Sequence, residues 1–180
     1  MADQAWRLIA PWATLPVFAG FFVLSLIFIF VLFPMHRKHY PTGTITLDAN
    51  RWGFTVEDAK ELLGRQLNAD QLRVYRRQEL VTDMLFPLVY GLGFAIAMVM
   101  LARYVGAPRW LIFLPILAAI ADYIENISVA MMIGRQLEGK ELGTVATIGS
   151  VASRFKHFLL LATVLTLFAL GGMALWRRFR

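Results

Sequence analysis

Residues 12–33 read WATLPVFAGFFVLSLIFIFVLF, and none of these 22 residues is Asp, Glu, Lys, Arg or His. Because roughly 20 largely apolar residues in a helix cross a bilayer core about 30 Å thick, this stretch predicts a membrane-spanning α-helix. Residues 84–102 and 158–176 form two further runs of this kind. The composition agrees, since 58% hydrophobic residues exceeds the share of roughly one half found in soluble domains. The sequence therefore predicts an integral, multi-pass membrane protein.

Residues 110–133 are also long enough to span, although Asp122 and Glu125 lie near the middle. As a soluble helix, this stretch would leave the apolar residues 111–121 in water and give an odd number of spans. We therefore predict an all-α fold, a bundle of four transmembrane helices at 12–33, 84–104, 110–133 and 155–176, with both termini on one side. Residues 1–180 form a single membrane domain.

The longest segment outside the predicted spans, residues 34–83, is predicted to form a small helical cap between the first and second membrane helices. Thr55 with Asp58, and Asn68 with Gln71, have the spacing of capping boxes at two helix starts. The second of these helices is expected to continue into the second span. Pro34 is expected to end the first span, and residues 134–153, with Gly139, Gly143 and Gly149, are expected to form a polar link.

The formal net charge is +6, but most basic residues flank the apolar runs, which favours binding to anionic lipid headgroups over nucleic acid. Six of the 18 Lys and Arg residues lie on the side of the termini, and the other twelve lie on the opposite side. Cytoplasmic loops carry the excess of basic residues. The count favours a cytoplasmic cap, the arginines at the C-terminus favour the reverse, and the direction of insertion stays open.

The chain has no cysteine, which excludes disulfides, thiol redox chemistry and clusters ligated by cysteine. His36 and His39 flank the first span without a third candidate ligand nearby, so we interpret them as interfacial polar residues. We expect neither a metal site nor a cofactor.

The main site candidates are Asp122, Glu125 and Asn126, which share one face of a helix because they are three and four residues apart. A carboxylate at the bilayer centre costs about 2.5 to 3.5 kcal/mol on insertion scales. These side chains are therefore expected to face the interior of the bundle or a cavity, while Ile120, Ile124 and Ile127 of the same segment point elsewhere.

Each of the other predicted spans carries a polar side chain at a depth similar to that of Glu125, and these are Ser25, Tyr90 and Thr163. We predict a polar layer in the bundle, with Asp122 about one helical turn deeper. Ser25 and Thr163 are also explained by hydrogen bonds within the bundle alone. Asp83, at the entrance of the second span, either joins this layer or pairs with Arg76, Arg77 or Arg154.

Two short motifs, DMLFPLVY at 83–90 and DYIEN at 122–126, resemble a family of small, uncharacterised bacterial four-helix membrane proteins. This resemblance covers most of the chain and implies a bacterial cytoplasmic (inner) membrane protein. A weaker likeness is to the EXPERA group of sterol isomerases and sigma-2 receptors, which implies a large first loop and carboxylates facing a pocket open to lipid. An intramembrane histidine of the isomerase type is missing, because His157 lies near the interface.

Three functions fit these features, and the sequence does not decide whether a reaction takes place. The first is an acidic site within the bundle that binds a lipid-like or cationic ligand through Asp122, Glu125, Tyr90 and Asn126. The second is a structural or accessory subunit that pairs its acids with a membrane protein partner. The third is a pathway for protons or cations. Membrane lipids are partners in every case.

Overall fold

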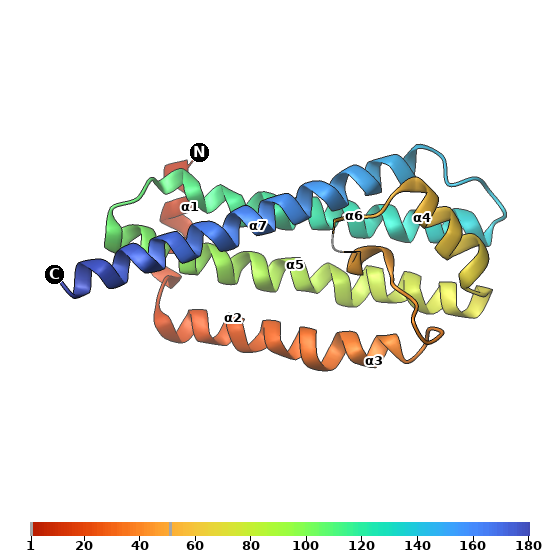
Figure 1. Ribbon diagram of the computed structural model, residues 1–180, viewed down its shortest axis with the longest axis horizontal. Coiled ribbons are helices and arrows are strands. Elements are labelled where there is room, and N and C mark those ends of the chain that lie inside the picture. Colours follow the sequence, from red (N-terminus) through yellow and green to blue (C-terminus); the bar gives the residue numbers. More distant parts are fainter. Residues whose placement is uncertain (1, 51) are drawn as a thin grey trace.

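The computed structural model describes residues 2–50 and 52–180, and within them every regular element is a helix or helical turn. Four helical segments run side by side along the longest axis (Figure 1). Each is long and apolar enough to cross a membrane, and their bounds are Leu15–Arg37, Ala69–Val105, Arg109–Leu137 and Thr144–Arg178. The predicted all-helical fold with four membrane helices is therefore confirmed.

The first membrane segment consists of α2 (Leu15–Ile27), the π-helical turn η2 (Phe28–Leu32) and α3 (Phe33–Arg37). The prediction that Pro34 ends this segment is wrong, because the helix continues to Arg37. Proline cannot donate a backbone hydrogen bond, and its ring crowds the preceding turn. The wider turn directly before Pro34, in which the Phe33 N–H donates to the Phe28 carbonyl, is a known way of fitting such a residue into a helix.

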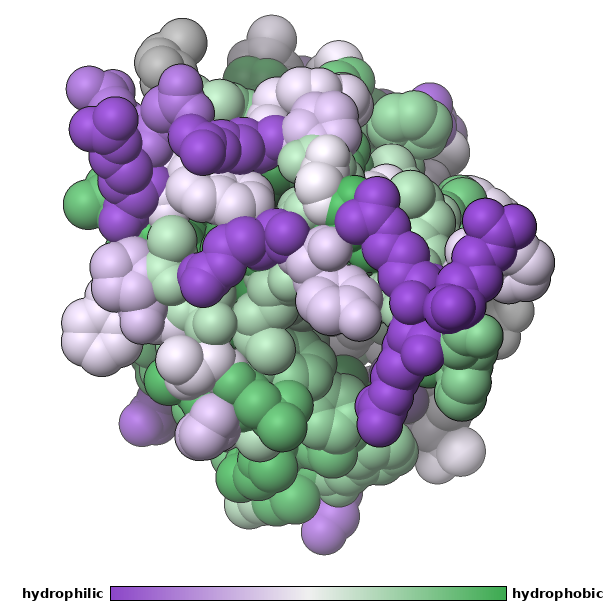
Figure 2. Space-filling model, turned by 90° about the vertical axis from the view of Figure 1, so that its left-hand side faces the viewer, coloured by the Kyte–Doolittle hydropathy of each residue, from purple (hydrophilic) through white to green (hydrophobic). Residues whose placement is uncertain are grey.

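Both termini lie at one end of the bundle (Figure 1). There the short helix α1 (Ala2–Ile9) and the turn η1 (Ala10–Trp12) pack on the ends of the long helices, with Trp6 buried. Asp3 accepts a hydrogen bond of 2.8 Å from Arg109, whose charge and hydrogen bond lower the pKa of Asp3. Figure 2 shows hydrophilic side chains over the upper left and the right of this end, next to a largely hydrophobic lower part, as expected where a bundle reaches the membrane interface.

The opposite end carries the cap, which contains η3 (Leu47–Ala49), α4 (Val56–Glu61) and η4 (Leu62–Gln66). Both predicted capping boxes are confirmed: Thr55 and Asp58 begin α4, and Asn68 and Gln71 begin α5 (Ala69–Val105). The cap has its own hydrophobic cluster, in which Phe54, Leu63 and Tyr75 pack against Met132 and Ile133. The cap is thus fixed onto the bundle rather than forming a separate unit.

The centre of the bundle is formed by α5, α6 (Phe113–Leu137) and α7 (Thr144–Arg178), and η5 (Arg109–Ile112) leads into α6. Small residues bring these helices close together: a Cβ atom added to Gly91 would lie 2.9 Å from the Cβ atom of Ala119. By contrast, α2 packs on α5 and makes few contacts with α7. The first membrane segment is therefore attached along one side only.

The predicted polar link at 134–153 is much shorter in the structure. Helix α6 continues to Leu137 and α7 begins at Thr144, so only residues 138–143 connect them. Gly139 and Gly143 adopt positive φ angles of 67° and 63°, which glycine reaches without steric cost. Gly149 instead lies inside α7, where an added Cβ would lie 2.9 Å from Ser128. Gly149 therefore serves helix packing, whereas Gly139 and Gly143 serve the turn.

Candidate functional site

The acidic residues of α6 face the interior of the bundle. Asp122, Glu125 and Asn126 are buried, whereas Ile120, Ile124 and Ile127 are exposed on the outer face of the same helix. This arrangement follows the helical period, since residues three and four apart share a face. The two acids therefore point into the bundle, as predicted from the sequence.

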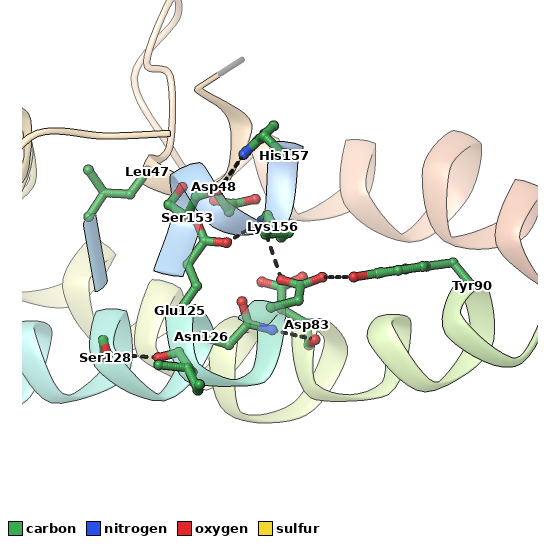
Figure 3. A network of polar contacts seen from close by, with 12 residues as sticks. Leu47, Asp48, Asp83, Tyr90, Glu125, Asn126, Ser128, Ser153, Lys156 and His157 are labelled. Atoms are coloured by element: carbon green, nitrogen blue, oxygen red, sulfur yellow. Dashed lines mark hydrogen bonds and ion pairs between the residues drawn. The ribbon is translucent and has the colours of Figure 1, made fainter. Parts of the chain in front are cut away.

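Lys156 of α7 lies beside Glu125 (Figure 3) and also contacts Asp122. Its ammonium group forms an ion pair with Glu125 and a second one, at 3.3 Å, with Asp122. Lys156 is only 6% exposed, and Glu125 is fully buried. A charged group this far from water is stable only when it is paired and hydrogen-bonded. The three residues thus form a buried charge cluster that joins α6 to α7.

Helix α5 contributes Tyr90, whose hydroxyl donates a hydrogen bond of 2.9 Å to the second carboxylate oxygen of Asp122. Asp122 therefore accepts one contact on each oxygen, from Tyr90 and from Lys156. Phe86 and Phe94, one helical turn before and after Tyr90, lie against its ring. This packing holds the Tyr90 hydroxyl in a direction that meets α6.

Asp83 joins the site, and does not pair with an arginine. The Gln78 amide donates a hydrogen bond of 3.1 Å to its carboxylate, and the Asn126 amide donates one of 2.7 Å to its backbone carbonyl. Gln78 in turn accepts a hydrogen bond of 2.9 Å from Tyr40 of the cap. Burial raises the pKa of Tyr40 above its usual range, so its hydroxyl remains a donor at neutral pH. The cap and the site are therefore hydrogen-bonded to each other.

Two further carboxylates lie near Asp83. Asp48 of the cap accepts a hydrogen bond of 3.2 Å from Tyr75, and Tyr75 accepts one of 2.9 Å from the backbone N–H of Leu47. Glu79, one helical turn before Asp83, is fully buried, and neither of its carboxylate oxygens has a hydrogen-bond partner among the described residues. Five carboxylates therefore lie in or beside the site, namely those of Asp48, Glu79, Asp83, Asp122 and Glu125.

The other two predicted residues do not join this network. Ser25 donates to the Phe21 carbonyl of its own helix at 2.9 Å, and Thr163 donates to the Leu159 carbonyl of its own helix at 2.8 Å. Ser25 lies on a cavity wall, whereas Thr163 is buried in the helix packing. Both hydrogen bonds agree with the alternative prediction, in which these two hydroxyl groups only form hydrogen bonds within the bundle.

A cavity of about 500 Å³ lies beside the network, between α2, α5 and α7. Its polar surface includes Gln78, Asp83, Asp122, Asn126 and Lys156. Its apolar walls come largely from six phenylalanines, which are Phe18, Phe21, Phe22, Phe33, Phe86 and Phe94. Along α5 the lining runs from Gln78 to Phe94, about 24 Å at a rise of 1.5 Å per residue. Arg37, Tyr40 and Asp48 line it where the membrane segments meet the cap.

Sequence reasoning missed Lys156 and Glu79. Lys156 lies inside the predicted fourth span, 155–176, but it was counted among the basic residues at the membrane boundary, because the uncharged run of that span begins only at Phe158. One signal was available: Lys156 is seven residues before Thr163, which puts both on the same face of a helix. Glu79 gave no such signal, because it precedes the second uncharged run and resembles a solvated residue of the cap.

Comparisons with protein-family models, with curated proteins and with solved structures find no match to this chain. The geometry of the site therefore carries the functional argument. In the part of the chain that the structure describes, no three His, Asp or Glu side chains are placed to hold a metal ion. His36 contacts the hydroxyl of Thr82 at 3.0 Å. The site is thus a charge cluster next to an aromatic cavity.

Proposed function

We propose that this protein binds an amphipathic, lipid-like molecule in the cavity between α2, α5 and α7. The observation that carries the proposal is the two-part lining: charged and amide side chains at the end toward the cap, and the rings of Phe18, Phe21, Phe22 and Phe94 toward the bundle centre. A ligand with a polar head and a hydrocarbon portion matches both parts. The buried network of α5, α6 and α7 would then orient the head.

The size and surface of the cavity support this proposal. Pockets for small molecules usually measure about 300 to 1,000 Å³ and combine apolar walls with a few placed polar groups. The volume of about 500 Å³ and the aromatic walls fall within that description. In this reading, the hydrocarbon portion lies against the rings, and the polar portion replaces water around Asp83, Asp122 and Lys156.

The weak packing between α2 and α7 gives the ligand a route from the bilayer. Helix α2 contacts α5 but makes few contacts with α7, and both helices line the cavity. A lipid-like molecule would therefore enter sideways, with no need to pass the cap. The resemblance to bacterial four-helix proteins supports the bacterial cytoplasmic membrane as the location.

The proton or cation pathway receives less support. At the end where the termini lie, the core is a cluster of apolar side chains that includes Trp6, Met98, Val99, Ile112 and Leu170. Among the residues described, the buried charged side chains are those of Glu79, Asp83, Asp122, Glu125 and Lys156, and none of them lies in this half. Because an ion in an apolar interior is costly, this half of the bundle acts as a barrier.

A blocking substitution with a matched control tests the proposal. In Ser25→Trp, an indole ring enters the cavity from α2, whereas in Gly20→Trp the same ring is placed on an open face of the same helix. The purified protein in lipid nanodiscs is photolysed with a phospholipid that carries a diazirine in its acyl chain. We expect Ser25→Trp to reduce specific crosslinking by at least about tenfold, equivalent to about 1.4 kcal/mol of binding, and Gly20→Trp to leave it unchanged.

Two results would contradict the proposal. Equal crosslinking in both variants would show that the cavity is not the binding site. Native mass spectrometry that finds a stoichiometric protein partner, and no retained lipid, would instead favour the accessory subunit. Ion flux into liposomes that Ser25→Trp blocks and Gly20→Trp does not block would instead favour the proton or cation pathway.

A further inference from the structure

We infer that the ligand's head carries a positive charge, and that Asp83, together with Asp48, receives it. This inference rests on the proposed binding function and names its ligand class, an amphiphile with an amine or quaternary ammonium group. It also reassigns the counter-ion from the pair that the sequence singles out, Asp122 and Glu125, to a different pair.

Asp122 and Glu125 already have their cation. Lys156 contacts both carboxylates, and Tyr90 donates to the remaining oxygen of Asp122. A second cation at this position would have to compete with an ammonium group that is fixed in the helix and 6% exposed. The pair is thus internally neutralised in part, and is suited to holding α6 and α7 together.

Asp83 differs from this pair. Its carboxylate accepts one hydrogen bond, from the neutral amide of Gln78, and it forms no ion pair with any residue in 2–50 or 52–180. Its side chain lines the cavity, as does that of Asp48. A buried carboxylate without a cation is costly in a membrane bundle. A bound cation would hold the Asp83 carboxyl group in its ionised form, and Asp83 is therefore a suitable counter-ion for a positively charged head.

The charge balance around the cavity points the same way. Among the residues described, three carboxylates line the cavity, together with the basic side chains of Arg37, Lys156 and His157. Two more carboxylates lie behind this lining. Glu125 forms an ion pair with Lys156, and Glu79 lies one helical turn from Asp83. Glu79 is fully buried with both oxygens unpartnered among the residues described. In the part of the chain that the structure describes, the acidic side chains in and behind the cavity therefore outnumber Arg37 and Lys156.

Aromatic rings complete the environment of a cation. Phe33, Phe86, Tyr40 and Tyr90 line the same cavity as Asp83. The faces of such rings attract ammonium groups, most strongly where water is excluded. An anionic head would meet the carboxylates of Asp48 and Asp83 instead. Arg37, the basic group at the cavity entrance, is exposed and so is a weaker attraction.

Three probes with the same alkyl chain test the charge preference: dodecyltrimethylammonium, dodecanol and dodecyl phosphate. Each competes with the diazirine phospholipid for the full-length protein in nanodiscs of neutral lipid. We expect the ammonium probe to compete at least about tenfold better than dodecanol, and dodecyl phosphate to compete worst. Asp83→Asn should remove the preference for the ammonium probe while dodecanol still competes. The amide is isosteric and keeps the contact with Gln78.

Matched variants locate the counter-ion. Asp70→Asn changes an exposed carboxylate near the start of the same helix and should keep the full preference. Asp48→Asn should reduce the preference in part. If dodecanol competes as well as the ammonium probe, or if Asp122→Asn and not Asp83→Asn removes the preference, the inference is overturned while the binding function stands. If none of the probes competes, the binding function itself fails.

Discussion

At the scale of single residues, Lys156 determines whether the buried charges are tolerated. Without it, Asp122 and Glu125 would lie together in the bundle with only Tyr90 as a donor. Removal of one partner from a buried ion pair costs about 3–5 kcal/mol, because the other charge stays buried and unpaired. We therefore expect Lys156→Met, which keeps the length of the side chain, to lower the free energy of unfolding by about this amount, measured by chemical unfolding in detergent micelles.

Two further variants show whether this loss comes from the buried charge. Lys140→Met removes a lysine whose ion pair with Glu138 is exposed, and should leave the unfolding midpoint unchanged. Lys156→Met combined with Glu125→Gln removes a carboxylate along with the cation, and should regain part of the lost stability. A double variant as unstable as Lys156→Met alone would mean that Lys156 acts through packing, and not through charge.

The same buried residues show which parts of the site the sequence predicts and which it does not. The helical period alone placed Asp122, Glu125 and Asn126 on one inward face, since an outward carboxylate in a bilayer is too costly. The period could not identify their partner, because a lysine next to an uncharged run resembles an interfacial residue. Only the packing of α7 on α6 brings Lys156 to them. The role of these residues in ligand binding stays a prediction.

At the scale of elements, close packing of α5 and α6 positions the site. An added Cβ at Gly91 would lie 2.9 Å from the Cβ atom of Ala119, a distance that requires one helix to shift. Overpacking of this kind costs about 1–3 kcal/mol, so Gly91→Ala should lower the free energy of unfolding by that amount. Gly20→Ala, on α2 with no atom within 4 Å, should not lower it. Parallel unfolding curves of the two variants check this difference.

The two glycines also test what holds the ligand site. If α5 and α6 move apart in Gly91→Ala, the contact from Tyr90 to Asp122 lengthens, and crosslinking of the lipid probe should fall together with stability. Gly20→Ala should keep both properties. Equal stability of the two variants would show that α5 and α6 adjust freely, and would argue against a rigid site.

Local sequence rules predicted some elements well and others poorly. The capping boxes at Thr55 and Asn68 are local, because each depends on side chains only three residues apart, and both are confirmed. The predicted helix end at Pro34 and the predicted polar link at 134–153 were wrong for the same reason. A proline or glycine breaks a helix only when nothing compensates it, and here a π turn and close contacts with Ser128 and Phe54 do so.

At the scale of the whole molecule, the bundle is divided along its length. The half toward the cap holds the carboxylates, Lys156 and the cavity, while the half toward the termini has an apolar core. Depth along each span predicted that polar residues would gather at one level. It could not predict the cavity, which exists because α2 stands against α5 and makes few contacts with α7.

The four helices along the long axis also predict how the chain crosses the membrane. Four spans place the termini on one side, and the cap with the α6–α7 turn on the other. The absence of cysteine makes the parent protein a ready background for single-cysteine variants. Gln4→Cys and Phe179→Cys mark the end with the termini, and Thr42→Cys and Glu141→Cys mark the opposite end, all at exposed positions. We expect a membrane-impermeant maleimide, applied to intact cells, to label one of these pairs and not the other.

The pattern of labelling also tests the helix that carries the acids. If α6 lay outside the bilayer, only three helices would cross, so Phe179→Cys would label together with Thr42→Cys, and Glu141→Cys together with Gln4→Cys. Labelling of all four positions after cell lysis is the control for accessibility. Whichever pair reacts in intact cells faces outward, which decides the direction of insertion that the opposing arginine counts left open. It also establishes from which leaflet a lipid-like ligand reaches the polar end of the cavity, because that end lies toward the cap.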